Sequence, residues 1–341
     1  MNKTYLFITA LFVLIFMSCQ SRKKNNAEKQ NEIELVAEKQ LVFPLDEQTY
    51  YLSKSMFQFE ENGKEYLHFE NTRKSLYDIV IFDIENKQIA KRIPLHKTGP
   101  NGLPAVYGSR PSPDSKQILI SQNNIGRLST INNQGEVVHN YPVKTPEGRF
   151  TTFFFCSYYN APAFVKDSCI FLNQGIFKPN MKREDWPQTH MFASQNLETG
   201  KFEWVPIFYP PIFKEEYENI DGGYGFSYDY NYKESRLVCG FFGYDSLMVT
   251  DDLKHIRWYN AKSKYLKSMK PKLGNAMAGI NSIIEFCEAP MYWHIMYDKY
   301  RDVYYRFAEM PYKLAPNESP YDEPKGKEFS VIVLNADFEI I

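Results

Sequence analysis

Residues with catalytic or metal-binding chemistry are scattered in this 341-residue chain. The six histidines stand singly, and none has a second ligand at the i+2 or i+4 spacing of a zinc site. The chain has no Gly-x-Ser-x-Gly elbow, His-Glu-x-x-His, Cys-x-x-Cys or phosphate-binding glycine loop. The sequence therefore predicts no catalytic residue, no metal and no cofactor. Paired carboxylates for glycosidase chemistry must meet in space, so the sequence leaves them open.

The stretch "MYDKYRDVYYR", residues 296–306, mixes tyrosines with charged residues. Such a mixture can hold a sugar or a peptide through ring stacking and bidentate hydrogen bonds. The candidate ligand-binding residues are Tyr297, Asp298, Arg301, Asp302 and Arg306. The alternative is a hairpin turn whose charges are solvated.

Two shorter motifs add further candidates. In "TGPNG", backbone N–H groups around Gly99, Asn101 and Gly102 can bind an anion or a carbonyl, unless the loop only connects two repeats. The triplet Asp245-Ser246-Leu247 is similar to the O-glycosylation acceptor of exported Bacteroides-type proteins, which makes Ser246 a candidate modification site, although so short a motif also arises by chance.

A repeated strand–turn–strand pattern positions these candidates. It occurs in "YDIVIFDIENKQIAKRIPL", "GRLSTINNQGEVVHNYPV", "HMFASQNLETGKFEWVPI", "DSLMVTDDLKHIRWYNA" and "FSVIVLNADFEII". Each turn opens with an Asp or Asn that tolerates the left-handed conformation, namely Asp83, Asn132, Asn196, Asp251 and Asn335. A second hairpin precedes each copy, for example "ENGKEYLHFEN" before the first. The repeating unit is therefore four strands.

Four-stranded antiparallel units that recur along a chain predict an all-β fold, a β-propeller, because stacked blades cover both faces of each sheet. A β-sandwich is the alternative. Five units are visible. Either five blades close the ring with residues 39–52 as the clasp, or the chain is a shortened version of a six- or seven-bladed protein with a truncated C-terminus, which we favour. Residues 39–52 are expected to supply an N-terminal strand, and the helix-forming stretches 214–220 and 274–286 to lie in connections.

The amino-acid composition favours β-strands and argues against a nucleic-acid partner. Aromatic residues make up 16% of the chain, with 25 Tyr and 26 Phe, and they favour pleated, half-buried surfaces. A net charge of −1 argues against nucleic acid, which needs a basic face. Four cysteines, Cys156, Cys169, Cys239 and Cys287, lie in apparent strands, and we interpret them as buried free thiols, with disulfide pairing left open.

The N-terminus is typical of an export signal. An apolar run from Tyr5 to Met17 follows Lys3 and is shorter than the roughly 20 residues of a spanning helix. Phe16-Met17-Ser18-Cys19 resembles the lipobox of bacterial lipoproteins, in which the peptide is cleaved before an acylated cysteine. The alternative is cleavage elsewhere, which leaves Cys19 an ordinary thiol.

The expected division is then a signal peptide over 1–18, a flexible tether over 19–38 and the propeller domain over 39–341. Gln20 in place of Asp favours the outer membrane, held by palmitate or a similar acyl chain on Cys19, with the facing of the domain left open.

These features resemble one family. The lipobox start, "HKTGPNGL" at 96–103, "MYDKYRDVYYRFAEMP" and the final "FSVIVLNADFEII" are similar to lipoproteins of the domain-of-unknown-function 4221 group, relatives of six-bladed propeller lipoproteins of Bacteroides-type bacteria. The resemblance implies a propeller and a lipid anchor, and no established activity. Members of the group usually run on past the point where this sequence stops.

Two classes of function remain from the sequence. The first is a lipid-anchored binding or scaffold module of the cell envelope that recognises a glycan, a peptide or a partner protein. The alternative is a propeller enzyme that acts on a polysaccharide or a peptide. An enzyme would gather two carboxylates, or a carboxylate and a histidine, at the mouth of the ring, whereas a binding module would present aromatic and neutral polar groups there. The sequence favours the binding module over the enzyme, with a purely structural envelope role as a third option.

Overall fold

Antiparallel β-hairpins form the regular structure of this protein. The computed structural model describes residues 40–53, 55–72, 76–112, 115–122, 126–143, 154–155, 157–158, 161–174, 188–210, 225–266, 284, 287–319 and 327–341. Successive strands in these ranges pair with their neighbours in the chain, which is the arrangement that short turns between alternating segments impose.

The first two sheets each contain four strands. The first sheet holds β1 (Met56–Glu61), β2 (Lys64–Asn71), β3 (Asp78–Asp83) and β4 (Gln88–Pro94). The second sheet holds β5 (Gly108–Pro111), β6 (Ile118–Gln122), β7 (Arg127–Ile131) and β8 (Val137–Pro142).

The next three sheets continue the pattern with local differences. The third holds β12 (Phe164–Lys166), β13 (Cys169–Gln174), β14 (Phe192–Asn196) and β15 (Phe202–Trp204), with β9 (Phe154–Phe155) also paired to β13. The fourth holds β16 (Phe226–Asn231), β17 (Arg236–Phe241), β18 (Ser246–Thr250) and β19 (Arg257–Asn260). The fifth holds β20 (Met291–Asp298), β21 (Val303–Glu309) and β22 (Phe329–Leu334), and a small pair joins β10 (Ser157–Tyr158) to β11 (Ala161–Pro162).

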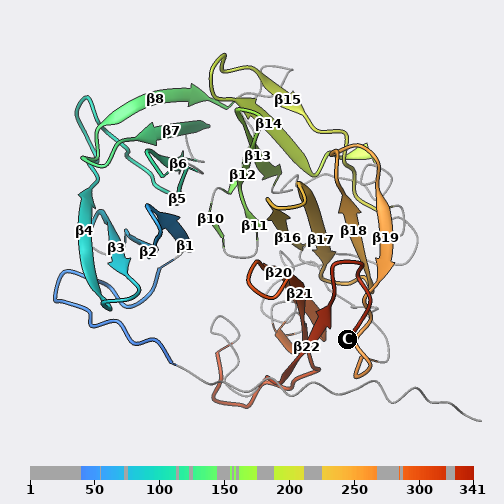
Figure 1. The fold of residues 1–341 in the computed structure, drawn as a ribbon. Helices are drawn as coiled ribbons and strands as arrows, with labels where there is room; N and C mark the ends of the chain where they lie inside the picture. The colour runs from blue at the N-terminus through green and yellow to red at the C-terminus, as the bar shows by residue number, and fades with distance from the viewer. Residues whose placement is uncertain are drawn as a thin grey trace, which may run out of the picture. The chain divides into compact units, whose positions relative to one another are not determined.

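The five sheets are the blades of a β-propeller. They follow one another in chain order around a common axis, with β1, β5, β12, β16 and β20 as their innermost strands (Figure 1). The predicted all-β propeller of four-stranded units is confirmed, and the β-sandwich is wrong. In the described residues the fifth blade has three full strands, and its fourth begins as a single bridge between Leu334 and Ile340. The fifth blade contacts the first directly, through Tyr300 and Glu65, so the described residues form a ring of five blades and the expected ring of six or seven is wrong.

The predicted turn residues act as hairpin turns require, with one correction. In four blades the side-chain oxygen of the turn-opening residue accepts a backbone N–H two or three residues later; these residues are Asp83, Asn132, Asn196 and Asn335. In the fourth blade this acceptor is Asp252, which takes the N–H of Lys254 at 3.0 Å, and not the predicted Asp251. Asp251 pairs instead with Arg236 and Arg257. The Asp-Asp doublet made the sequence ambiguous by one residue.

Apolar side chains fill the space between successive blades. Buried clusters join the first blade to the second around Ile79 and Ile120, and the second to the third around Leu128 and Leu172. Further clusters join the third to the fourth and the fourth to the fifth. Each sheet therefore covers the face of the next, as a propeller requires. The fifth cluster stays within the first blade and its N-terminal segment, since it contains Phe69, Val80 and Phe82 with Phe43 packed against them.

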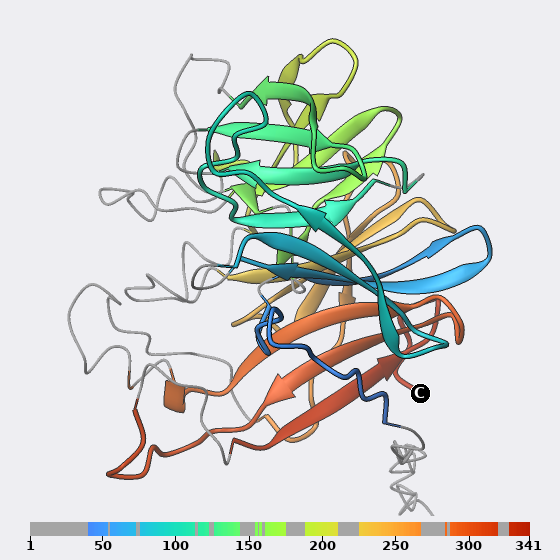
Figure 2. The ribbon, with the colours of Figure 1, turned by 90° about the vertical axis from the view of Figure 1, so that its left-hand side faces the viewer.

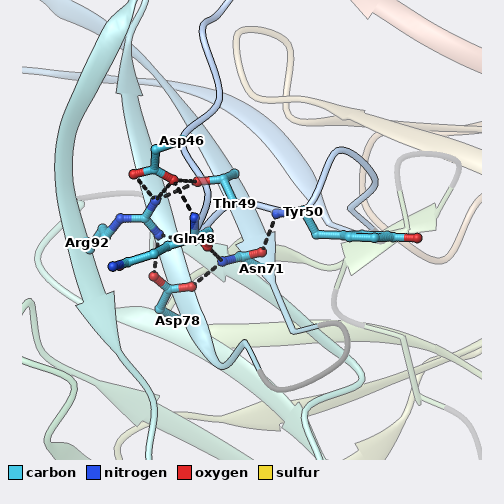
Figure 3. A network of polar contacts seen from close by, with 7 residues as sticks. All are labelled: Asp46, Gln48, Thr49, Tyr50, Asn71, Asp78 and Arg92. Atoms are coloured by element: carbon cyan, nitrogen blue, oxygen red, sulfur yellow. Dashed lines mark hydrogen bonds and ion pairs between the residues drawn. The ribbon is translucent and has the colours of Figure 1, made fainter.

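The N-terminal segment lies along the first blade and is not the predicted strand. Residues 40–52 contain no strand. The ring of Phe43 packs on Phe82 at 5.3 Å between centroids, and a polar network then fixes the chain that follows (Figure 3). Arg92 at its centre binds Asp46 and Asp78, each at 2.6 Å.

Asn71 completes that network. Its side chain donates to the carbonyl of Gln48 at 2.8 Å and accepts the N–H of Tyr50 at 3.0 Å. Two backbone groups of this segment are thereby satisfied by a side chain and not by a strand partner.

Several predictions fall outside the described residues. They concern the signal peptide, the tether with Cys19, Cys156, the helix-forming stretch 214–220 and most of 274–286. In the part of the chain that the structure describes, no helix has the length and apolar character needed to cross a membrane. Cys169, Cys239 and Cys287 are free thiols, of which Cys239 is buried and the other two are partly buried.

Candidate functional site

The turn between β20 and β21 holds three of the predicted ligand-binding residues, Asp298, Arg301 and Asp302, and Tyr297 precedes it in β20. The carboxylate of Asp298 accepts the backbone N–H groups of Tyr300 at 2.9 Å and Arg301 at 3.1 Å, and the N–H of Asp302 returns to the Asp298 carbonyl. Asp302 adopts a positive φ of 57°, which Asp tolerates better than most residues. Residues 298–302 are thus a hairpin turn, as the alternative interpretation expected.

Both carboxylates of this turn are held in their ionised form. Burial raises the pKa of Asp298, but hydrogen bonds from Arg301 and from backbone N–H groups outweigh it and leave this pKa below the ordinary value. Hydrogen bonds from Lys233 and from the hydroxyl of Tyr297 lower the pKa of Asp302. Neither group is prepared to act as a general acid near neutral pH.

The same turn reaches the first blade. The hydroxyl of Tyr300 hydrogen-bonds the carboxylate of Glu65, Gln58 donates to that hydroxyl at 3.3 Å, and the ammonium of Lys299 lies 3.9 Å from Glu60. The β1–β2 and β20–β21 turns therefore lie side by side at one end of the ring (Figure 2).

We call the turns at this end the hairpin rim, formed by residues 61–64, 232–235 and 299–302. Lys233 joins the fourth blade to it through Asp302. Tyr300 is 64% exposed, and the side chain of Arg301 is 71% exposed. Tyr232, from the fourth blade, is also exposed. The rim thus offers aromatic surfaces and a guanidinium to solvent.

Arg306, the fifth predicted residue of this stretch, does not belong to the surface. It is fully buried, and its guanidinium donates to the backbone carbonyls of Asp245 at 2.6 Å, Ala261 at 2.8 Å and Tyr244 at 2.5 Å. It lies 3.6 Å from the centre of the Tyr292 ring. Burial lowers the pKa of Arg306 to about 10, so it remains charged near neutral pH. Arg306 therefore ties the fifth blade to the fourth and is unavailable to a ligand.

The "TGPNG" loop serves a connection between blades. The side chain of Asn101 accepts the N–H of Val137 at 3.0 Å, and the N–H of Gly102 donates to the carbonyl of Gly99 at 2.9 Å. Gly99 has a positive φ of 88°. A Cβ on Gly102 would lie 2.9 Å from that same carbonyl oxygen, so the glycine is required by the turn itself. The geometry favours the connection over an anion site.

Ser246 begins strand β18, opposite Asn260 in β19, and is partly buried. The neighbouring Asp245 is engaged, since its carboxylate accepts the Tyr292 hydroxyl at 2.7 Å and its carbonyl accepts Arg306. O-glycosylation of Ser246 stays a prediction.

A buried polar cluster between the first and second blades was not found from the sequence. The Glu70 carboxylate accepts the hydroxyls of Ser55 and Ser109, each at 3.0 Å, and Ser109 contacts Nε2 of His68 at 2.8 Å. Since Ser109 donates to Glu70, the consistent tautomer of His68 carries its proton on Nε2. His68 and Glu70 lie on β2, Ser109 lies on β5, and Ser55 is the residue before β1. The sequence signals only that His68 and Glu70, two positions apart on one strand, share a face.

This cluster is not a hydrolytic triad. In a triad the histidine stands between the serine and the acid, whereas here Ser109 stands between His68 and Glu70. All of these side chains are buried, and burial lowers the pKa of His68 to about 3. The imidazole is therefore neutral and sealed from substrate.

Across the axis, Asp229 of β16 is a partly buried carboxyl. Its oxygens accept the N–H groups of Tyr297 and Tyr230, each at 2.8 Å, but burial dominates and raises its pKa. The charge of Arg110, on β5, acts on both Asp229 and His68, and its guanidinium lies over the ring of Phe57 at 5.2 Å. The third blade separates β5 from β16 around the ring, so this influence crosses the axis.

Within the described ranges, no accessible pair of carboxylates and no accessible carboxylate with a histidine has the perturbed pKa values of acid–base catalysis. No group of three or more His, Cys, Asp or Glu side chains is placed to hold a metal ion in those ranges. The groups that the hairpin rim exposes are tyrosine rings and charged side chains held in ion pairs.

The fold and this site define a β-propeller with an exposed rim of hairpin turns. The family model of a domain of unknown function, DUF4221, matches residues 32–341, and the chain belongs to that family. A DUF4221 member from Bacteroides vulgatus, solved as a crystal structure, is 84% identical, with a TM-score of 0.87 over 92% of this chain and 86% of that chain.

A more distant structure shows the fold alone. A putative exported protein from Bacteroides fragilis shares 9% identity, with a TM-score of 0.52 over 88% of this chain and 73% of that one. No curated protein matches this chain.

Proposed function

We propose that this protein is a lipid-anchored binding module of the cell envelope that recognises a glycan or a peptide through the hairpin rim. The observation that carries the proposal is the exposure of Tyr300 and Arg301 on a turn whose backbone is fixed by Asp298. Tyrosine and arginine on a pre-organised turn contribute binding surface at low cost in side-chain entropy, because the backbone beneath them is already ordered.

The charges of the rim also favour binding over catalysis. Asp298 and Asp302 are stabilised as anions by the groups around them, whereas a glycosidase needs one carboxyl kept protonated. Asp229 has a raised pKa, but its oxygens are already used by backbone N–H groups of two blades. A propeller enzyme acting on a polysaccharide or peptide is the second candidate, and Asp229 is the observation in its favour.

The proposed attachment to a membrane rests on the N-terminal sequence. An apolar run too short to span, followed by Ser18 and Cys19, fits cleavage before an acylated cysteine. Acyl chains stabilise attachment by about 0.8 kcal/mol per buried CH₂, so several chains hold a folded domain at a membrane surface. With Gln20 after the cysteine, the outer membrane is the proposed location.

The binding proposal is tested by probing glycan and peptide arrays with the full-length protein purified in detergent, while hydrolysis of bound members is followed in parallel. We expect binding without turnover, and at least a tenfold loss of affinity in Tyr300→Ala and Arg301→Ala. Tyr265→Ala is the matched control, because Tyr265 is also an exposed tyrosine but lies outside the rim. Turnover would support the enzyme, and no binding to either array would favour a structural role.

The proposed lipid anchor on Cys19 is tested separately. Cys19→Ala is expected to abolish palmitate labelling and to move the protein from the membrane fraction to the soluble fraction. Cys169→Ala is the control, because Cys169 lies within the third blade. Unchanged labelling in Cys19→Ala would contradict the anchor and leave the binding proposal standing.

A further inference from the structure

Two exposed tyrosines of the hairpin rim are each held by a neighbouring blade. The hydroxyl of Tyr232, in the turn between β16 and β17, accepts the backbone N–H of Val165 in the third blade at 3.2 Å. The hydroxyl of Tyr300, in the turn between β20 and β21, donates to the carboxylate of Glu65 in the first blade. Each ring is therefore fixed at both ends, by its own backbone and by a blade to which it does not belong.

A stack of buried rings also sets the orientation of Tyr232. The Tyr232 ring meets the Tyr230 ring edge-on, with centroids 4.9 Å apart and an angle of 81° between the planes. Tyr230 lies parallel to Phe164 at 4.3 Å, and Phe164 lies parallel to Phe171 at 4.7 Å. The last three residues are buried, whereas Tyr232 is 50% exposed. A rigid support thus presents a ring to solvent.

The support of Tyr300 is polar instead of aromatic. Its backbone N–H donates to the carboxylate of Asp298 at 2.9 Å, and Gln58 donates to its hydroxyl at 3.3 Å. The ammonium of Lys299 lies over the ring, 4.8 Å from its centroid. A cation in this position occupies one face of a ring, and most of Tyr300 remains exposed.

Ion pairs lie along the rim between the two tyrosines. Lys233 follows the first tyrosine directly and pairs at 2.5 Å with Asp302, which comes two residues after the second. Arg301 pairs with Asp298 at 2.8 Å. Each of these cations has one anion as its partner, so the pairs offer hydrogen-bond donors and acceptors without adding net charge.

This combination favours an uncharged sugar chain as the ligand. The apolar face of a sugar ring can stack on a tyrosine, and sugar hydroxyls both donate to carboxylates and accept from ammonium or guanidinium groups. A charged ligand would have to displace one member of an ion pair and leave the other without its partner. Proline-rich peptides also bind aromatic rings, but they dock in aromatic-lined grooves, whereas ion pairs separate the two rings here.

We infer that the hairpin rim binds an uncharged glycan chain along the turns of the fourth and fifth blades. One sugar of the chain stacks on Tyr232 and another stacks on Tyr300. Hydroxyls of the sugars between them bond to the pair of Lys233 and Asp302. This inference rests on the proposed binding function of the rim, and it adds the class of ligand and a second stacking surface.

The test uses linear cello-, manno- and malto-oligosaccharides of two to eight units, titrated calorimetrically into the full-length protein in a detergent without a sugar head group. A chain long enough to reach both rings gains a second contact, so the wild-type affinity should rise at least about tenfold with chain length for the sugar that fits. The affinity should change less than about threefold between low and high salt, because the ligand carries no charge.

Tyr232→Ala is expected to abolish the rise with chain length. Its affinity for the shortest chains should stay within about threefold of the wild type, because these chains reach only one ring at a time. Tyr265→Ala, which removes an exposed tyrosine outside the rim, should retain the rise. Urea denaturation checks that each variant is folded, and the wild-type length series needs no variant.

A proline-rich decapeptide and oligogalacturonides serve as comparison probes. Binding of the peptide alone, binding of the acidic sugars alone, or binding of uncharged chains without dependence on their length or on Tyr232 overturns this inference. Each of these results leaves the rim as a binding surface. Binding of none of these probes, together with no binding on the glycan and peptide arrays, overturns both this inference and the proposed function.

Discussion

The space between the third and fourth blades differs from the space between the fifth and first blades, which we call the closing seam. Aromatic side chains fill the former, and polar contacts join the blades across the latter. In the former, Phe192 packs edge-on against Tyr228 at 4.9 Å and Phe226 at 5.6 Å, and all three rings are buried. In the closing seam, Tyr300 meets Glu65 and Gln58 through its hydroxyl, and its ring is mostly exposed.

Neighbouring blades are thus held together either by buried aromatic packing or by exposed polar contacts. Buried aromatic rings stabilise through the apolar area removed from water and through packing. Exposed hydrogen bonds and ion pairs contribute little, because water competes for the same groups. The first kind of contact fixes the blades of this propeller, and the second kind leaves Tyr300 largely exposed.

The largest expected effect lies in the aromatic space. Phe192→Ala removes a fully buried ring from the cluster of the third and fourth blades, and we expect it to lower the free energy of unfolding by about 3–5 kcal/mol. Phe43→Ala, in the N-terminal segment, should cost about 1–2 kcal/mol, because that ring is only partly buried. Urea denaturation measures both. Equal losses would contradict the contrast between the two regions.

An intermediate effect is expected from acid. The pKa of His68 is lowered to about 3 by burial, and that of His294 to about 4. Both stay neutral in the folded protein at pH values where the unfolded chain binds protons, so the free energy of unfolding falls as the pH drops from about 6.5 toward these values. The slope is up to about 1.4 kcal/mol per pH unit for each histidine.

The variant His68→Gln tests whether His68 causes this pH dependence of the free energy of unfolding. A glutamine amide can still donate to Ser109, but it does not titrate. Urea denaturation at pH 7, 6, 5 and 4 should therefore show a shallower loss of stability for the variant than for the wild type. Parallel pH profiles would show that His68 is not the group responsible.

The smallest effect is expected in the closing seam. Tyr300→Phe removes the hydroxyl that contacts Glu65 and Gln58, and it should lower the free energy of unfolding by less than about 1 kcal/mol, because the contact is exposed. Tyr265→Phe is the control for loss of an exposed hydroxyl. A loss as large as that of Phe192→Ala would mean that polar contacts, and not apolar filling, hold this seam.

The repeat could be predicted from sequence because its signals are local. Alternating apolar residues and an Asp or Asn at each turn specify a hairpin over a dozen residues, and Asn132, Asn196 and Asn335 accept the backbone N–H groups that this role requires. The turn acceptor in the fourth blade is Asp252 and not the predicted Asp251, because either residue of the Asp-Asp doublet satisfies the pattern. A prediction from this pattern can therefore misplace a turn by one residue.

The candidate site was only partly predictable. Arg301 follows Asp298 by three residues, so the local sequence specifies the turn that joins them. Arg306 lies in the same stretch, yet it is buried among backbone carbonyls of the fourth blade. Nothing near it in the sequence distinguishes a solvated arginine from one that bridges two blades.

The sequence by itself determined the strands, their turns and the architecture that covers both faces of each sheet, because these follow from periodicity over short distances. Only the tertiary structure decided that His68 and Glu70 of one blade meet Ser109 of the next, and that Tyr300 of the fifth blade meets Glu65 of the first. Contacts between blades join residues tens to hundreds of positions apart, and which faces meet depends on how the whole ring packs.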